Sequence, residues 1–296
     1  MYHKAVMVNE VIEALSVKKD GVYVDATFGG GGHASAILTC LENGRLVAFD
    51  QDDDACGNVP DDARLIFVNQ NFRYLKNFLK WHQCIPVDGI LADLGISSHQ
   101  IDMAERGFST RYGGPLDMRM NRKAGLTASK VINTYSVEQL TTLFSVYGEL
   151  RNARRIALAI ERQRREEPIE TTERFTDLLR PLVPRGRESK YFAQAFQALR
   201  IEVNGEMDAL RELLTQSLEV LKQGGRLVVI SYHSLEDRLV KNFMKTGNFE
   251  GTISKDFFGH YSTPLKMLSK AITASAEEVS QNSRARSARL RVAEKL

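Results

Sequence analysis

The chain has 296 residues, of which 43% are hydrophobic, and a formal net charge of +3. This length suits one large domain or two smaller ones with real cores, and no apolar run approaches the roughly 20 residues of a membrane span. The first residues lack the hydrophobic region of a signal peptide, and Cys40, Cys56 and Cys84 form no paired metal spacing, so we expect a cytoplasmic protein without a metal site.

The first third of the chain alternates between predicted strands and helices. Such alternation indicates a parallel sheet with covering helices, an α/β architecture in which ligands bind beyond the carboxyl ends of the strands. The pattern predicts strands at 21–25, 45–50, 64–68 and 87–93, and helices at 33–42, 52–58 and 72–81.

Four consecutive glycines, Gly29 to Gly32, lie between the first strand and the first of these helices. Glycine permits a tight turn, and the start of a helix offers free N–H groups to a ligand. A flexible surface loop is the alternative. The strand before the glycines and the alanine-rich helix after them favour a nucleotide-like ligand.

The glycine run lacks the spacing of the common phosphate-binding motifs. Gly29, Gly31 and His33 give G-x-G-x-H rather than G-x-G-x-x-G, and no G-K-[ST] follows. Asp25 would repel a pyrophosphate but not a cationic amino-acid or sulfonium group. Asp50, at the end of the second strand, is placed to accept hydrogen bonds from ribose hydroxyls, unless it is only a solvated turn acid. The combination resembles the first motif of Rossmann-like S-adenosylmethionine methyltransferases.

After about residue 104 the strand pattern stops for roughly a hundred residues. We therefore expect a Rossmann-like domain of residues 1–103 and 204–296 with an inserted α-helical, substrate-recognition domain of residues 104–203. The later elements are predicted as helices at 136–147, 149–166, 171–180, 189–202, 205–222 and 235–245, and as strands at 226–230 and 287–293.

The predicted insert is basic. It holds 18 Lys and Arg against 12 Asp and Glu, a net charge of +6, and the remainder of the chain holds 22 against 25. An excess of this kind indicates an anionic partner, although solvated arginines on helix faces would give the same count. The arginines that could grip an RNA backbone are Arg151, Arg154, Arg155, Arg162, Arg164 and Arg165.

Two further segments follow predicted strands and so belong to the same edge of the sheet. Residues 102–120 form a long loop rich in glycine and charge, which is more often functional than a plain connection. Residues 231–238 read SYHSLEDR, where Ser234 resembles a helix N-cap with Asp237 three residues later. No G-x-S-x-G occurs, so hydrolase chemistry is disfavoured.

Seven motifs occur in one order and span nearly the whole chain. They are the glycine loop with His33, DLGISSHQID at 93–102, RGFS at 106–109, GPLDMRM at 114–120, FQALRIEVN at 196–204, ISYHSLEDR at 230–238 and SRARSARLRVAEK at 283–295. Together they resemble the family of bacterial small-subunit ribosomal RNA (cytosine-N4)-methyltransferases. The resemblance implies a target cytidine in the decoding region, a homodimer, and S-adenosylmethionine contacts at Gly31, Gly32, His33, Asp50, Phe72, Asp93 and Gln100.

One segment departs from the family pattern. Before FQALRIEVN the family commonly shows His-Pro-Ala-Thr-Arg, whereas this chain has Lys-Tyr-Phe-Ala-Gln ending at Gln194. The change puts details of RNA contact in question but not the reaction.

For such a reaction the exocyclic amine of cytosine needs an acceptor for its N–H as positive charge develops on the nitrogen. Asp93 is the favoured residue, although it could serve only the cofactor, and Asp117 and His233 are reserve candidates. No cysteine adjoins the motifs, which disfavours covalent attack on the ring. Two alternatives stay open from the sequence: a methyltransferase of the same fold acting on a protein or small molecule, and a non-catalytic ribosome-assembly factor.

Overall fold

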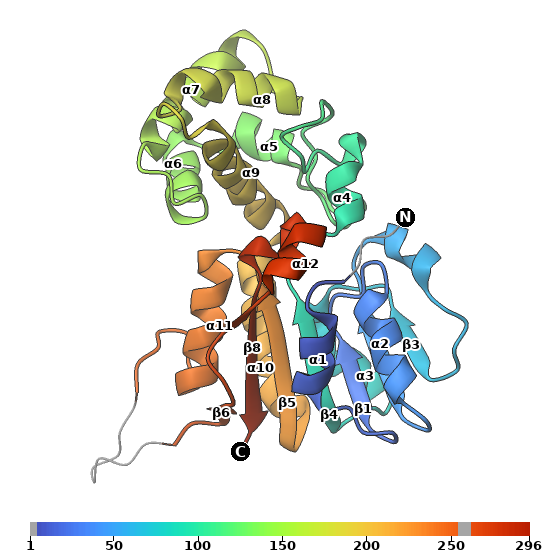
Figure 1. The fold of residues 1–296 in the computed structure, drawn as a ribbon. Coiled ribbons are helices and arrows are strands. Elements are labelled where there is room, and N and C mark those ends of the chain that lie inside the picture. The colour runs from blue at the N-terminus through green and yellow to red at the C-terminus, as the bar shows by residue number, and fades with distance from the viewer. Residues whose placement is uncertain (1–4, 254–261) are drawn as a thin grey trace. The chain divides into compact units, whose positions relative to one another are not determined.

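The computed structural model describes residues 5–253 and 262–296. The chain divides into two compact units: a first unit of Met1–Gly95 with Asp208–Leu296, and a second unit of Ile96–Met207. Figure 1 labels the elements of both. The second unit interrupts the first directly after the fourth strand of its sheet.

The first unit is built on one eight-stranded sheet with the order β3-β2-β1-β4-β5-β8-β6, and β7 pairs with β8. Strands β1 to β5 are parallel, whereas β8 runs antiparallel to β5. The central strands are almost continuously apolar, as expected for a parallel sheet that is covered on both faces. The strands are β1 (Val22–Asp25), β2 (Arg45–Phe49), β3 (Leu65–Val68), β4 (Val87–Asp93), β5 (Leu221–Ser231), β6 (Leu265–Met267), β7 (Ile272–Thr273) and β8 (Arg289–Lys295).

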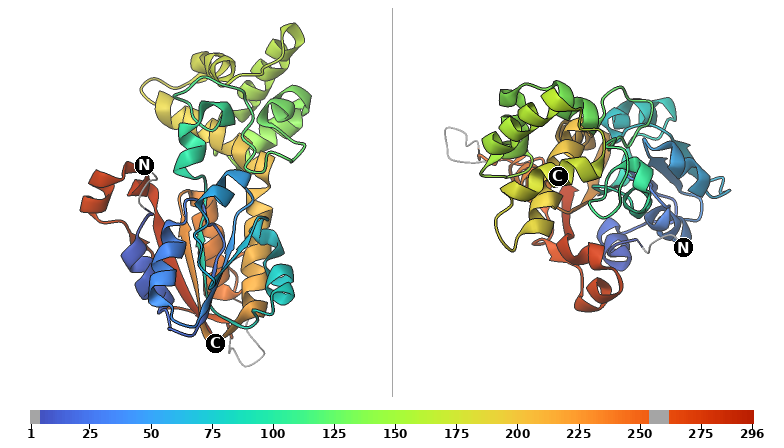
Figure 2. Two further views of the ribbon diagram at one scale, coloured as in Figure 1. Left: turned by 90° about the vertical axis from the view of Figure 1, so that its right-hand side faces the viewer. Right: turned by 90° about the horizontal axis from the view of Figure 1, so that it is seen from above.

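Helices cover both faces of this sheet. Helices α1 (Val8–Leu15) and α2 (Gly32–Cys40) lie on one face, and α3 (Leu75–Trp81) and α10 (Glu206–Val220) lie on the other (Figure 2). Arg73, just before α3, is paired with Glu212 of α10 at 2.8 Å. Helix α11 (Ser234–Thr246) packs against β6 and β8, and α12 (Ala276–Gln281) precedes β8.

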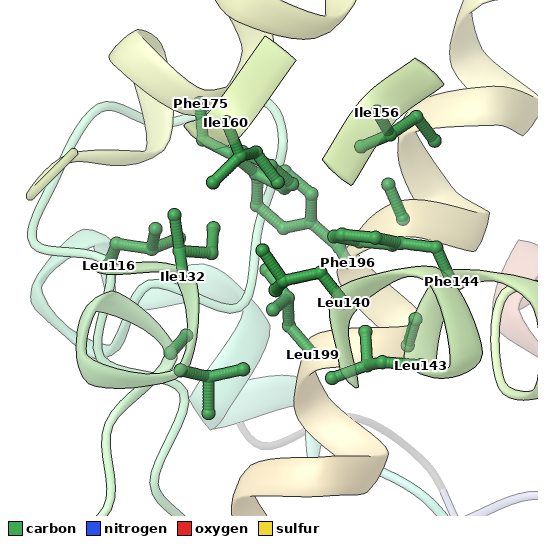
Figure 3. Packing of buried hydrophobic residues seen from close by; sticks show 14 of the residues in the cluster. Leu116, Ile132, Leu140, Leu143, Phe144, Ile156, Ile160, Phe175, Phe196 and Leu199 are labelled. Atoms are coloured by element: carbon green, nitrogen blue, oxygen red, sulfur yellow. The ribbon is translucent and has the colours of Figure 1, made fainter. Parts of the chain in front are cut away.

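The second unit is helical and has its own core. Phe144, Phe175 and Phe196 form its centre, with ring centroids 6.2 and 5.7 Å apart, and aliphatic side chains surround them (Figure 3). Such fully buried aromatic residues contribute several kcal/mol of stability in total. The helices are α4 (Ser98–Asp102), α5 (Ala128–Thr134), α6 (Val137–Val146), α7 (Ala153–Glu166), α8 (Thr172–Leu179) and α9 (Glu188–Asn204).

The predicted α/β fold class is confirmed, and each predicted strand matches a strand of the sheet. The helix predicted at 52–58 is a 3-10 helix, Asp53–Asn58, and the helix predicted at 72–81 begins with a 3-10 turn, Phe72–Tyr74, and continues as α3. The sequence patterns missed α1, α4, α5, α12, β6 and β7. Among the described residues, no helix is both long and apolar enough to cross a membrane.

Candidate active site

The glycine turn joins the end of β1 to the start of α2. Gly29 and Gly31 have φ of +52° and +76°, values that favour glycine, and Gly31 is the N-cap residue of α2. A Cβ at Gly31 would also lie 2.9 Å from the ring of Phe28. The turn thus requires glycine for its shape, and it brings the first turn of α2 to the edge of the sheet where β1 ends.

Asp50, which follows β2, holds this turn in place. Its Oδ2 accepts a 2.7 Å hydrogen bond from the Gly29 N–H, and its Oδ1 accepts one of 2.9 Å from the Asp52 N–H. Burial raises the pKa of Asp50 to about 6, although these hydrogen bonds lower it. A carboxylate has about four lone-pair sites, so these two bonds leave acceptor capacity for ribose hydroxyls.

Asp25, the last residue of β1, is completely buried. Its Oδ1 accepts a 3.1 Å hydrogen bond from the Thr27 N–H, whereas its Oδ2 has no hydrogen-bond partner among the described residues. Burial raises the pKa of Asp25 to about 6; His33 opposes the shift, and the carboxylates of Asp93 and Asp50 add to it. Because an unpaired buried carboxylate is costly, the site favours a nearby cation.

Asp93 ends β4 and connects several parts of the site. Its Oδ1 accepts a 2.7 Å hydrogen bond from the hydroxyl of Tyr232, just after β5, and its N–H donates to Thr27 Oγ1 at 2.7 Å. Its Oδ2 lies 3.8 Å from Nδ1 of His33, and its side chain keeps 21% of its surface exposed. Burial raises the pKa of Asp93 above its usual range, whereas His33 and Tyr232 lower it.

The His33 side chain is buried behind the glycine turn. Its Nε2 lies 2.8 Å from the carbonyl oxygen of Val6. A carbonyl only accepts hydrogen bonds, so Nε2 carries the hydrogen and donates. The imidazole therefore connects the segment before α1 to Asp93.

His233 and Glu236 form the start of α11. His233 is the N-cap residue, and Glu236, three residues later, accepts hydrogen bonds from the Tyr232 and His233 N–H groups at 3.0 and 3.4 Å. The prediction that Ser234 caps this helix with Asp237 is wrong by one residue. Asp237 instead pairs with Arg291 of β8 at 2.7 Å, so it ties α11 to the sheet.

The remaining predicted site residues differ from one another in their surroundings; they are Phe72, Gln100 and Asp117. Phe72 begins the 3-10 helix after β3 and is partly buried. Gln100 belongs to the second unit, where its side chain completes the capping box of α4 with Ser97. Asp117 also lies in the second unit; burial opposes ionisation, but hydrogen bonds from Arg119 outweigh it, so the pKa of Asp117 is lowered.

The loop of residues 102–120 is fixed within the second unit by buried polar side chains. Arg106 donates to the carbonyl groups of Arg119 and Met120 at 3.0 and 3.1 Å. Asn204, the last residue of FQALRIEVN, donates to Met118 O and accepts from Met120 N, both at 2.8 Å. These parts of the motifs therefore shape the loop.

Three carboxylates thus gather where β1, β2 and β4 end, beside the glycine turn. Asp25, Asp50 and Asp93 raise the local negative potential, and Oδ2 of Asp25 lacks a partner among the described residues. A ligand with cationic groups and a ribose fits this set of acceptors, and a pyrophosphate does not. Tyr232, which reaches Asp93 from the end of β5, is the site residue that the sequence motifs did not single out.

Comparison with known proteins gives full-length matches. The model of the MraW methylase family matches residues 1–296. A ribosomal RNA small subunit methyltransferase H from Bacteroides fragilis (strain YCH46) is 54% identical over 296 residues, which covers 99% of this chain and 97% of that protein. The protein of the same name from Christiangramia forsetii is 53% identical and covers 100% of this chain and 98% of its own. A putative methyltransferase from Streptococcus mutans, solved in complex with SAH, aligns loosely, with a TM-score of 0.45 and 11% identity over 99% of this chain and 100% of that one.

Proposed function

The chain belongs to the MraW methylase family, and from this membership we infer that it is an S-adenosylmethionine-dependent methyltransferase of small-subunit ribosomal RNA. We propose further that the target atom is N4 of a cytidine in the decoding region of 16S ribosomal RNA. The proposal is supported by the order of the seven motifs along the chain.

The observation that carries the cofactor assignment is the set of three carboxylates beside the glycine turn. We propose that Asp50 holds the ribose and that Asp25, with its unpaired Oδ2, favours the cationic methionine part through its charge. Gly31, Gly32 and His33 would present backbone N–H groups. Contacts of the cofactor with Phe72, Asp93 and Gln100 stay predictions from the family resemblance. When bound, S-adenosylmethionine supplies a sulfonium methyl group.

Asp93 is the residue that we propose to receive the target amine. The hydrogen bond from Tyr232 uses one lone pair of Oδ1, so Oδ2 keeps the larger capacity to accept an N–H of cytosine N4. As the amine gains the methyl group and positive charge, Oδ2 would stabilise that charge and take the departing proton. The raised pKa of Asp93 suits this acceptance of a proton.

The two reserve candidates are less suited to this role. Asp117 forms two hydrogen bonds with the Arg119 guanidinium, at 2.8 and 2.6 Å, which neutralise its charge. His233 is engaged as the N-cap of α11. We therefore propose that Asp117 and His233 hold their own segments in place, and that Asp93 accepts the target amine.

The proposed partner is the small ribosomal subunit or its RNA, which would place the enzyme in the cytoplasm. The homodimer implied by the family resemblance stays a prediction. To reach an active-site pocket, the target base must leave its stack. The free-energy cost of unstacking is lowest in single-stranded or looped RNA.

Mass mapping of small-subunit RNA tests the proposed target. Deleting the gene for this chain should remove a single N4-methylcytidine from the decoding region, and returning the gene should restore it. A gene carrying Asp93→Asn should fail to restore it if the carboxylate accepts the amine. Persistence of the modification in the deletion strain would refute the assignment.

A further inference from the structure

Helix α7 of the second unit separates its residues sharply into two faces. Ala153, Ile156, Ala157 and Ile160 are buried in the helical core. Arg155 and Arg162 are exposed and lie seven residues apart in the helix, which places them together on the opposite face, and Arg151 is exposed in the turn just before the helix. Leu158 lies on the same face and is 49% exposed.

The arginines of this face differ from Arg164 and Arg165 of the same helix in their pairing. Within the described chain, no ion pair or side-chain hydrogen bond engages the guanidinium groups of Arg151, Arg155 or Arg162. Arg164, in contrast, turns inward and donates to Ile132 O and Tyr135 O at 2.9 and 2.7 Å. Arg165 pairs with Glu161 at 2.8 Å. Of the six arginines that the sequence suggests for RNA contact, Arg164 and Arg165 are therefore engaged within the unit, and contact of the other four with RNA stays a prediction.

A second basic segment lies next to the start of α7. Asn152 accepts a 3.0 Å hydrogen bond from the Tyr191 hydroxyl and donates one of 3.2 Å to Leu182 O, so the start of α7 lies beside residues 182–191. The exposed cations of that segment are Arg185, Arg187 and Lys190, with Glu188 as the one exposed acid among them.

We propose that the exposed cations of these two segments form one binding surface for the RNA backbone of the small subunit. We call this surface the α7 basic face, and it consists of Arg151, Arg155, Arg162, Arg185, Arg187 and Lys190. A guanidinium group that is not paired within the protein can donate two parallel hydrogen bonds to the oxygens of one phosphate. An exposed cluster of such cations therefore favours a polyanion. This inference rests on the proposed function for the identity of the partner. It adds to that function the surface on which the RNA backbone is held.

The test compares variants with equal loss of charge. Arg155→Gln with Arg162→Gln removes two cations from the α7 basic face. Arg174→Gln with Lys130→Gln removes two cations of the same unit that are already engaged, by Glu167 and by the carbonyl of Gly125 at 2.6 Å. Equilibrium binding to small subunits and to naked 16S RNA is measured across salt concentrations without a methyl donor, and turnover is measured separately.

The α7 pair should weaken binding about tenfold or more at low salt and lower the slope of log affinity against log salt by roughly 1.4 to 1.8, the value for two phosphate contacts. KM for the subunit should rise, whereas kcat and S-adenosylmethionine affinity should stay within about twofold. Arg155→Lys with Arg162→Lys should keep most of the affinity that the glutamine pair loses, because the ammonium group of lysine also pairs with a phosphate, as a point charge.

Three results would overturn the proposal: unchanged affinity and slope, an equal loss in the control pair, or weaker binding with an unchanged slope, which would indicate a ribosomal protein as the partner. Failure of the proposed function would look different. In that case the unmodified enzyme would bind RNA through the α7 basic face but leave cytidine N4 unmethylated.

Discussion

The hydroxyl of Tyr232 donates a 2.7 Å hydrogen bond to Oδ1 of Asp93, which joins the end of β5 to the end of β4. These strands are neighbours in the sheet, although the two residues are 139 positions apart in sequence. The bond fixes the rotation of the Asp93 carboxylate and leaves Oδ2 for a substrate. Tyr232 is therefore a positioning residue in the proposed mechanism.

Tyr232→Phe should lower kcat by roughly 10- to 100-fold, because a mispositioned acceptor loses transition-state stabilisation. KM for S-adenosylmethionine should change little. Since the Tyr232 hydrogen bond lowers the pKa of Asp93, its loss should also move the acidic limb of the kcat profile to higher pH. Tyr74→Phe, on an exposed tyrosine, is the control. A profile that keeps its position would argue that Tyr232 acts only in packing.

Asp50→Ala should weaken S-adenosylmethionine binding by about 10- to 100-fold. The change removes the proposed ribose acceptor and also releases the Gly29 N–H that Asp50 holds at 2.7 Å. Isothermal calorimetry measures the affinity, and Asp61→Ala, at an exposed position nearby in sequence, is the control. Affinity equal to that of the unmodified protein would remove Asp50 from the site.

S-adenosylmethionine affinity should fall as the pH drops below about 6. Asp25 and Asp50 both have a pKa of about 6, so each takes up a proton there and loses the charge that attracts a cationic ligand. The loss should approach tenfold per pH unit for each group that must be ionised. Methylthioadenosine keeps the ribose but lacks both cations, so its binding should depend less steeply on pH. Equal slopes for the two ligands in calorimetry would contradict a role for Asp25.

Asp25→Asn should stabilise the ligand-free protein at pH 8. The folded-state pKa of Asp25 is raised from 3.8 to about 6, so its contribution favours folding at low pH and is lost as the pH rises to about 6. The corresponding free energy is on the order of 3 kcal/mol, and the gain at pH 8 should shrink toward pH 4. Urea unfolding followed by circular dichroism measures it. A variant that is less stable at pH 8 would show that contacts of the Asp25 carboxylate outweigh the cost of burying its charge.

The sequence was sufficient for those parts of the fold that depend on local pattern. The β-branched strands and the carboxylates at their ends are local features, so the positions of Asp25, Asp50 and Asp93 along the sheet edge followed from parallel topology. Helix α1 was missed because it has no local start signal. Its N-cap Met7 adopts φ of 55° and offers no side-chain hydrogen bond.

Nonlocal contacts were beyond sequence reasoning. The bond between Tyr232 and Asp93 depends on the register of β4 against β5, which places Asp93 opposite Ile230 across an insertion. The inward turn of Arg164 likewise depends on carbonyl groups near α5, and nothing in its own segment distinguishes it from Arg162. Capping of α11 by His233 rather than Ser234 shows the same limit, because histidine is not a preferred cap.

Transfer of labelled methyl groups from S-adenosylmethionine to small subunits from the deletion strain tests the central claim most directly. The purified chain should place label at N4 of a single cytidine in the decoding region of 16S ribosomal RNA, and the Asp93→Asn variant should place little or none. Label in ribosomal protein, at another nucleotide, or nowhere would contradict the account.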